Sequence, residues 1–152
     1  MATVEQTMFK VQRILTGPMN LRIQLQGNTM YVQFSDASTQ VSLSVAEWGK
    51  SKEGEPRSLV NISSPILWSV TPTPELFEWI AREGGRYYFG HVSAADDIRD
   101  AGKVFLSMNH TLLGDYIDEE ELASAMYAVL NTADQLDDEL QKRFGGKRWT
   151  DT

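Results

Sequence analysis

The sequence predicts an α+β domain in which helices flank an antiparallel sheet. Several short runs alternate apolar and polar side chains, and amphipathic helical patterns stand near the start, after the middle and at the end of the chain. The predicted order is α-β-β-β-(β)-α-β-β-α, and strands in runs with helices between them are typical of this class. The 152 residues fit one domain, predicted over residues 1–146, with a short C-terminal tail at 147–152.

The first predicted helix follows Thr3. Gln6 stands three residues later, which is the spacing of a capping box. Apolar residues then recur every three or four positions and give the helix one buried stripe. Gly17 and Pro18 should end it. The stripe consists of Val4, Met8, Val11 and Leu15.

Three strands are predicted next, over residues 21–25, 30–34 and 41–45, because apolar and polar side chains alternate in each run. Gly27 and Asn28 stand between the first two runs, which indicates a two-residue hairpin turn. The alternation predicts strands of an antiparallel meander, each with one face toward water.

Residues 49–57, GKSKEGEPR, predict a polar loop, and residues 58–70 resume a strand-like pattern. Pro65 interrupts that pattern. Because proline cannot donate a ladder hydrogen bond, it should mark an edge, a bulge or a bend.

A second helix is predicted to begin at Thr73-Pro74-Glu75, which supplies a capping hydroxyl, proline at the first position and an acid in the first turn. Gly84 and Gly85 should end it. Its predicted buried stripe is Leu76, Phe77 and Ile80.

The segments RYYFGHV (86–92) and KVFLSMNH (103–110) predict two more strands, with SAADDIRDAG (93–102) as a polar connector. A helix of about 27 residues should follow, which at 1.5 Å per residue is roughly 40 Å long. Gly145 and Gly146 should terminate it. Its apolar stripe is Leu122, Met126, Val129, Ala133, Leu136 and Leu140.

Four consecutive acids, Asp118–Glu121, open this last helix and raise the question of a metal site. A calcium loop needs oxygen ligands at alternate positions and a central glycine, and this run has neither. Asp118 instead stands where an N-cap belongs, with its carboxylate in reach of the Glu121 amide. Ile117 and Leu122 fit a hydrophobic staple around it. The acidic run therefore predicts a helix start and no metal site.

Composition narrows the classes of partner. The net charge of −7 argues against nucleic acid, whose phosphates would repel such a surface. The chain has no cysteine, which excludes disulfides and thiolate metal sites. No apolar run approaches the roughly 20 residues that a membrane span needs, and the first residues do not resemble a signal peptide. We therefore expect a cytoplasmic protein with no membrane partner.

Catalytic motifs are also missing from the sequence. It contains no nucleophile elbow and no glycine-rich nucleotide motif, so we expect no enzyme and no cofactor. His91 and His110 could meet Asp96 or Asp97 if their strands were neighbours. Nothing in the spacing supplies the third ligand of a metal site. A small enzyme that uses a histidine with an acid stays open as an alternative.

The chain has more aromatic side chains than a small core can readily bury. Tyr31 alternates against the apolar positions of its strand, and Trp68 follows two apolar residues at a predicted bend. Large amphipathic rings at a surface often mark protein contacts. Burial of both sheet faces within one chain would explain them equally well. The predicted partner-binding residues are Tyr31, Trp48, Leu67 and Trp68.

The pattern as a whole resembles the small chaperones of type III secretion systems and the related YbjN-type domains. Beside the first helix, the similarity rests on RIQLQGNTMYVQFSDASTQVSLSV (22–45), SSPILWSVTPTPELFEWIA (63–81) and HTLLGDYIDEEELASAM (110–126), which leads into the closing helix and RFGG. The resemblance implies an α-β-β-β-α-β-β-α fold, a homodimer, and exposed apolar grooves that hold segments of client proteins. The strand-like stretch at 57–70 is an addition to that pattern.

These observations predict a non-enzymatic module that binds an apolar segment of a partner protein. Binding would use a groove between the sheet and a helix, or strand addition at an open edge. The alternative is a sensory or regulatory domain, which would hold a small ligand in a compact apolar pocket.

Overall fold

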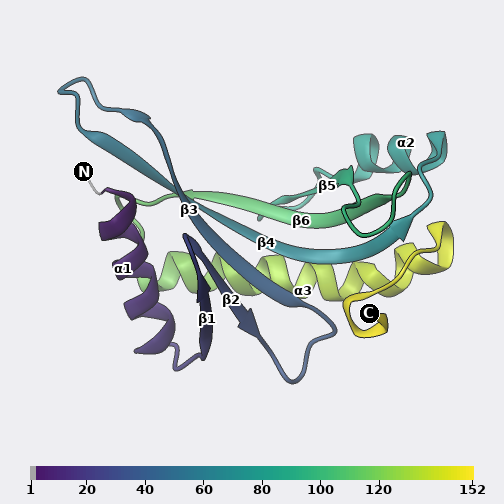
Figure 1. The fold of residues 1–152 in the computed structure, drawn as a ribbon, viewed down its shortest axis with the longest axis horizontal. Helices are drawn as coiled ribbons and strands as arrows, with labels where there is room; N and C mark the ends of the chain where they lie inside the picture. Colours follow the sequence, from purple (N-terminus) through teal and green to yellow (C-terminus); the bar gives the residue numbers. More distant parts are fainter. Residues whose placement is uncertain (1–2) are drawn as a thin grey trace.

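Six antiparallel strands form one sheet, in the spatial order β1-β2-β3-β4-β6-β5, in a computed structural model that describes residues 3–152 (Figure 1). The predicted α+β class and the predicted order of elements are confirmed. The strands are β1 (Ile23–Gln26), β2 (Thr29–Gln33), β3 (Gln40–Lys50), β4 (Pro56–Val70), β5 (His91–Asp96) and β6 (Val104–Leu113). The helices are α1 (Val4–Thr16), α2 (Pro74–Glu83), α3 (Glu119–Phe144) and the 3-10 helix η1 (Trp149–Asp151).

The core lies between one face of this sheet and the helices α1 and α3, of which α3 runs along the sheet (Figure 1). Because side chains alternate between the two faces of a strand, every second residue of the predicted strands points into the core. Each large apolar side chain buried in this way contributes roughly 1.5–3 kcal/mol. The fully buried side chains from the sheet include Met30, Val32, Leu43, Ile62, Leu106 and Met108, and those from α3 include Leu122, Met126, Val129 and Leu140.

The three α-helices begin where the sequence predicts. The Thr3 hydroxyl accepts from the Gln6 amide at 3.2 Å, and the Gln6 side chain accepts from the Thr3 amide at 3.0 Å, which completes the capping box. In α3 the Asp118 carboxylate accepts from the Glu121 amide at 2.8 Å. The Thr73 hydroxyl caps α2 in the same way. The acidic run is therefore a helix start, as predicted.

The stretch around Pro65 is a continuous central strand, β4, of 15 residues between β3 and β6. The register of β4 against β6 shifts between Pro65 and Leu67, so the proline stands at a bulge, one of the three predicted outcomes. The preceding loop is shorter than predicted, because β3 continues to Lys50 through a second bulge between Glu47 and Gly49.

The strand predicted over residues 86–92 is confirmed at His91 and Val92 and is wrong at 86–90, since β5 begins only at His91. Gly90 precedes it with φ +96°, and an added Cβ would lie 2.6 Å from the Asn109 carbonyl oxygen, so the chain enters the sheet through a close backbone approach. The predicted connector instead contributes residues 93–96 to β5, which pairs with β6 as far as Asp96.

The predicted stripe of α2 is wrong at Phe77, whose side chain is 47% exposed. Trp79 takes its place in the core at 6% exposure, together with Leu76. The spacing explains this outcome, because residues three apart share a helix face and adjacent residues do not. Within residues 3–152, no helix is both long enough and apolar enough to cross a membrane.

Candidate functional site

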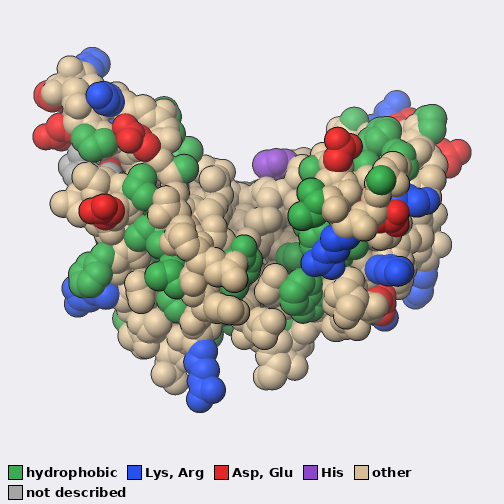
Figure 2. All heavy atoms as spheres, in the orientation of Figure 1, with side chains coloured by type: hydrophobic (Ala, Val, Ile, Leu, Met, Phe, Trp, Pro, Cys, Tyr) green, Lys and Arg blue, Asp and Glu red, His purple; other side chains and the backbone are tan. Residues whose placement is uncertain are grey.

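The second face of the sheet, which we call the open face, is not covered by α1 or α3. Its central row runs across five strands through Tyr31, Ser42, Ser63, Asn109 and His91, which the strand register places side by side. Figure 2 shows that the middle of the molecule is hollowed on this side, with most charged side chains on the two raised ends. The flanking positions are mainly uncharged and polar: Gln24, Gln26, Thr29, Gln33, Gln40, Ser44, Asn61, Ser93, Ser107 and Thr111.

A groove of about 530 Å³ lies at the β1-β2-β3 end of the molecule. The groove is open to solvent and its lining mixes polar and apolar groups, which differs from the compact apolar pocket expected of a small-ligand sensor. Amide side chains offer both donors and acceptors and match a peptide backbone or another uncharged polar group. The lining residues are Arg22, Ile23, Gln24, Gln26, Tyr31, Gln33, Gln40 and Trp149.

The predicted binding residues do not meet in one patch. Tyr31 lies half-buried in the groove, whereas Trp48 is 46% exposed near the far end of β3, with the Arg57 guanidinium 5.5 Å from its ring centroid. Trp68 lies toward the other end of β4, 11 positions from Arg57, or roughly 36 Å at 3.3 Å per residue. Trp48 and Trp68 therefore cannot contribute to one short binding site.

Leu67 is fully buried, so its predicted place on a binding surface is wrong. The bulge after Pro65 interrupts the alternation of β4, and Ile66 and Leu67 are both buried as a result. Trp68 is half-buried by its own chain. Its ring stacks on Phe105 at 3.8 Å, and the Arg99 guanidinium lies 3.8 Å from its centroid.

An apolar site that the sequence reasoning missed lies on the outer side of α1. Phe9 is 64% exposed, and it lines a pocket of about 270 Å³ with Lys10, Arg13, Ile14 and Pro18. Phe9 falls outside the predicted core stripe of α1. A large apolar residue on the polar side of an amphipathic helix was the signal that could have indicated this site.

The edge strand β1 follows α1 after a tight turn, in which the Met19 amide donates to the Ile14 carbonyl at 3.2 Å and the Leu21 amide to the Leu15 carbonyl at 2.8 Å. Leu25 on β1 is 49% exposed and, as the register partner of buried Met30, lies on the sheet face that α1 covers. Among the described residues, only β2 pairs with β1. The outer backbone of β1 is thus open for strand addition, and a short turn connects this strand to the helix that carries the Phe9 pocket.

The two histidines lie on opposite faces of the sheet. His91 is the register partner of Asn109, and His110 follows Asn109 directly and pairs with Ile62 on the core side. Partial burial lowers the pKa of His110, and the nearby charge of His91 lowers it further. In residues 3–152 no group of three histidine, aspartate or glutamate side chains could hold a metal ion. The structure therefore places these rings in no shared reaction centre.

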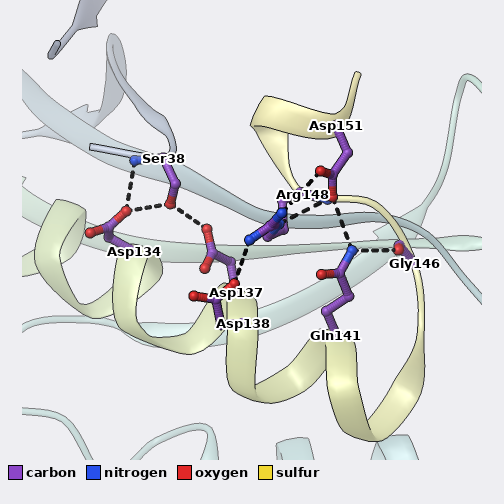
Figure 3. Close-up of polar contacts among 8 residues, drawn as sticks. All are labelled: Ser38, Asp134, Asp137, Asp138, Gln141, Gly146, Arg148 and Asp151. Carbon is purple, nitrogen blue, oxygen red and sulfur yellow. Dashed lines mark hydrogen bonds and ion pairs between the residues drawn. The ribbon is translucent and has the colours of Figure 1, made fainter. Parts of the chain in front are cut away.

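One buried carboxyl group, that of Asp137 on α3, is 1% exposed and has an Oδ1 atom without a hydrogen-bond partner (Figure 3). The Ser38 hydroxyl contacts both Asp134 and Asp137, and the Ser38 amide donates to Asp134 at 2.7 Å. A hydroxyl has a single proton and can donate to only one of the two carboxylates. A proton on Asp137 supplies the second donor. Burial raises the pKa of Asp137, which favours that protonated form.

This arrangement predicts a pH-dependent stability difference between the unmodified chain and Asp137→Asn. A raised folded-state pKa gives stability that is present below the ordinary carboxyl pKa and is lost as pH rises through the raised value. Asparagine stays neutral and can donate to Ser38 at every pH. We expect Asp137→Asn to match the unmodified chain near pH 4 and to be more stable at pH 8 by about 1 kcal/mol, the scale of one buried unsatisfied polar group.

Urea denaturation at several pH values measures this difference. Glu139→Gln, at an exposed position of the same helix, is the control for removal of an acid. A constant difference between Asp137→Asn and the unmodified chain from pH 4 to pH 8 would contradict the protonated state of Asp137.

Comparison with known proteins gives a family and a fold. The sequence profile described as "T3SS (YopN, CesT) and YbjN peptide-binding chaperone 1", TY-Chap1, matches residues 52–152. Among solved structures, a chain of the "Crystal Structure of the ExsC-ExsE Complex" superposes with a TM-score of 0.57 at 18% identity, covering 86% of this chain and 93% of that chain. Comparison with curated proteins gives no match.

Proposed function

We propose that this chain, which belongs to the TY-Chap1 family of T3SS and YbjN peptide-binding chaperones, binds an extended apolar segment of a partner protein and catalyses no reaction. The match covers residues 52–152, which include β4, the central strand of the sheet, and α3. The resemblance noted in the sequence is thus confirmed at the level of the family. The identity of the segment and the surface that holds it are part of the proposal.

The observation that carries the proposal is the open edge of β1, which a short turn connects to the helix that carries the Phe9 pocket. A partner segment can add a strand to this edge by backbone hydrogen bonds and place alternate side chains toward α1. At the other edge of the sheet, the Val92 amide of β5 donates to the Gly84 carbonyl at 2.8 Å, so part of that edge is occupied. This contrast favours the β1 edge as the binding position.

The charge around the pocket indicates the kind of segment that fits. Lys10 and Arg13 line the pocket, and Arg22 precedes β1, although the whole chain carries a net charge of −7. A segment with apolar residues and at least one acid would be complementary to the apolar pocket and to the basic side chains around it. A strongly basic segment would be disfavoured here.

Phe9→Ala is expected to weaken partner binding by about 10- to 100-fold, because an exposed phenylalanine that becomes buried in a complex contributes roughly 1.5–3 kcal/mol. The measurement is titration of the purified partner against both proteins. Phe77→Ala on α2 is the matched control, since Phe77 is similarly exposed at 47% but lies on another helix. Equal affinities for Phe9→Ala and the unmodified chain would place the site elsewhere.

The partner itself can be identified with a photo-crosslinking phenylalanine at position 9 in the native host, followed by mass spectrometry. The same probe at position 77 shows which captured proteins depend on the α1 surface. We also infer a homodimer from the family resemblance. Light scattering, compared with the 17.1 kDa of one chain, tests this inference separately.

A further inference from the structure

The C-terminal segment fills a stretch of strand edge that the sheet leaves unpaired. The last register pair between β3 and β4 is Ser42 with Ser63, whereas β4 continues to Val70. Beyond the end of β3, Trp68 forms an antiparallel bridge with Lys147. The Trp68 amide donates to the Lys147 carbonyl at 2.7 Å, and the Lys147 amide donates to the Trp68 carbonyl at 2.8 Å. We call residues 146–152 the strap.

Side chains of α3 hold the strap in place (Figure 3). The Arg148 guanidinium bonds Asp138 of α3 at 2.5 Å and Asp151 of the strap at 3.1 Å. Gln141 donates to the Gly146 carbonyl at 3.1 Å and to the Asp151 carboxylate at 3.0 Å. These groups are partly exposed, so the individual ion pairs hold the strap only weakly.

The connection to α3 suits a segment that can leave and return. Gly145 and Gly146 join the helix to the strap with φ values of +76° and +92°. Glycine adopts these conformations without steric cost and gives the junction freedom to move. An added Cβ at Gly146 would lie 2.7 Å from the Trp68 carbonyl oxygen, so the strap packs closely onto β4.

The residues of the strap also indicate which kind of peptide fits this strand edge. Its sequence KRW is basic and then aromatic, in a chain of net charge −7. Arg148 pairs with an acid of α3, and Trp149 forms part of the wall of the Tyr31 groove. A backbone bridge at Lys147, a guanidinium facing an acid and an indole at the groove together describe a basic-aromatic peptide in its binding site, which pairs with the strand edge at one residue and then turns into η1.

We propose that the edge of β4 at Trp68 is a second strand-addition site, which the strap occupies in the free protein and which a basic-aromatic segment of a partner protein takes by displacing it. The proposal rests on the proposed function only in that the occupant is a protein segment. It requires an occupant opposite in charge to the one favoured at the β1 edge. The two sites can therefore be tested apart.

The test measures binding of a fluorescein-labelled peptide, GGKRWTDT, to full-length variants by fluorescence anisotropy. Arg148→Ala loosens the strap but keeps the acid that receives the peptide's arginine. We expect it to bind the peptide about 10-fold more tightly than the unmodified chain, because the binding-competent open state becomes more populated. The double variant Arg148→Ala/Asp138→Asn loosens the strap in the same way, because Asp138 has already lost its partner in Arg148→Ala, but it lacks that acid, so we expect no gain in affinity.

Amide hydrogen exchange in the unmodified chain provides a second readout that needs no variant. With excess peptide, the Lys147 amide should lose protection because the strap is displaced. The Trp68 amide should keep its protection, because the peptide supplies a carbonyl in place of that of Lys147. Protection at Leu25 on β1 should not change, which separates this site from the β1 edge.

Three results would overturn the proposal. The first is equal affinity of the peptide for Arg148→Ala and the unmodified chain, with no change in exchange at Lys147. The second is an equal gain for Arg148→Ala and the double variant Arg148→Ala/Asp138→Asn, which would mean that Asp138 does not recognise the peptide's arginine. The third is a larger assembly of Arg148→Ala than of the unmodified chain in light scattering with no binding of the peptide, since the occupant would then be the strap of a second copy.

Discussion

Leu67→Ala should lower the free energy of unfolding by about 2–5 kcal/mol, the range found when a buried leucine is truncated and leaves a cavity. The side chain is fully buried on β4 opposite Leu106, and its Cβ lies 3.6 Å from the position of an added Cβ at Gly146. Few atoms here can move to fill the space, because β4 is paired or covered on both edges at this point. Urea denaturation measures the loss. The slope of the free energy of unfolding against urea concentration should stay unchanged.

Trp48→Ala is the matched control, since the sequence assigned Trp48 and Leu67 the same role. Trp48 is 46% exposed, and its truncation should cost much less than that of Leu67. If Leu67→Ala instead left stability unchanged and abolished partner binding, the predicted role of Leu67 in binding would be right. The side chain would then not contribute to the core as its burial indicates.

The helix starts could be predicted from the sequence because each depends on residues close together in the chain. Thr3 with Gln6, and Asp118 with Glu121, are three positions apart, and each cap closes within one helical turn. The hairpin at Gly27 and Asn28 is local in the same sense. Such signals need no knowledge of the rest of the fold.

Strand limits could not be predicted, because they depend on partners far away in the sequence. The extension of β3 to Lys50 follows from pairing with Pro56 across a bulge, and β5 starts at His91 because β6 offers a register there. A bulge was one of the three outcomes predicted for Pro65, but its effect on the next residues was not predicted. It buries two consecutive side chains, Ile66 and Leu67, so the alternation that works elsewhere assigns Leu67 wrongly.

In the candidate sites too, local features could be predicted from the sequence and features that depend on distant residues could not. Phe9 could have been found from helical periodicity, since it lies on the polar side of an amphipathic helix. The bridge between Trp68 and Lys147 joins residues 79 positions apart and has no sequence signature. The KRW triplet was visible in the sequence, but its meaning depends on where the chain returns to the sheet.

Gly114→Ala should destabilise the protein by about 3 kcal/mol, the upper part of the range for insertion of a methyl group into a packed core. Gly114 is buried where α1 meets the sheet, and its amide donates to the Ser58 carbonyl at 2.8 Å. An added Cβ would lie 2.3 Å from the Ser58 hydroxyl oxygen and 2.7 Å from the Thr7 methyl carbon. Both are short, fully buried side chains that hydrogen-bond each other at 2.5 Å, so neither can rotate away without loss of that bond.

The least costly relief for Gly114→Ala is a movement of α1 away from β4, which would also displace Phe9 relative to β1. We therefore expect weaker partner binding together with the lower stability, measured by titration under conditions where the variant is folded. Gly85→Ala is the control, because an added Cβ at Gly85 meets no atom within 4 Å. Full partner affinity in a destabilised Gly114→Ala protein would mean that the position of α1 does not determine binding, and would count against the Phe9 pocket as part of the site.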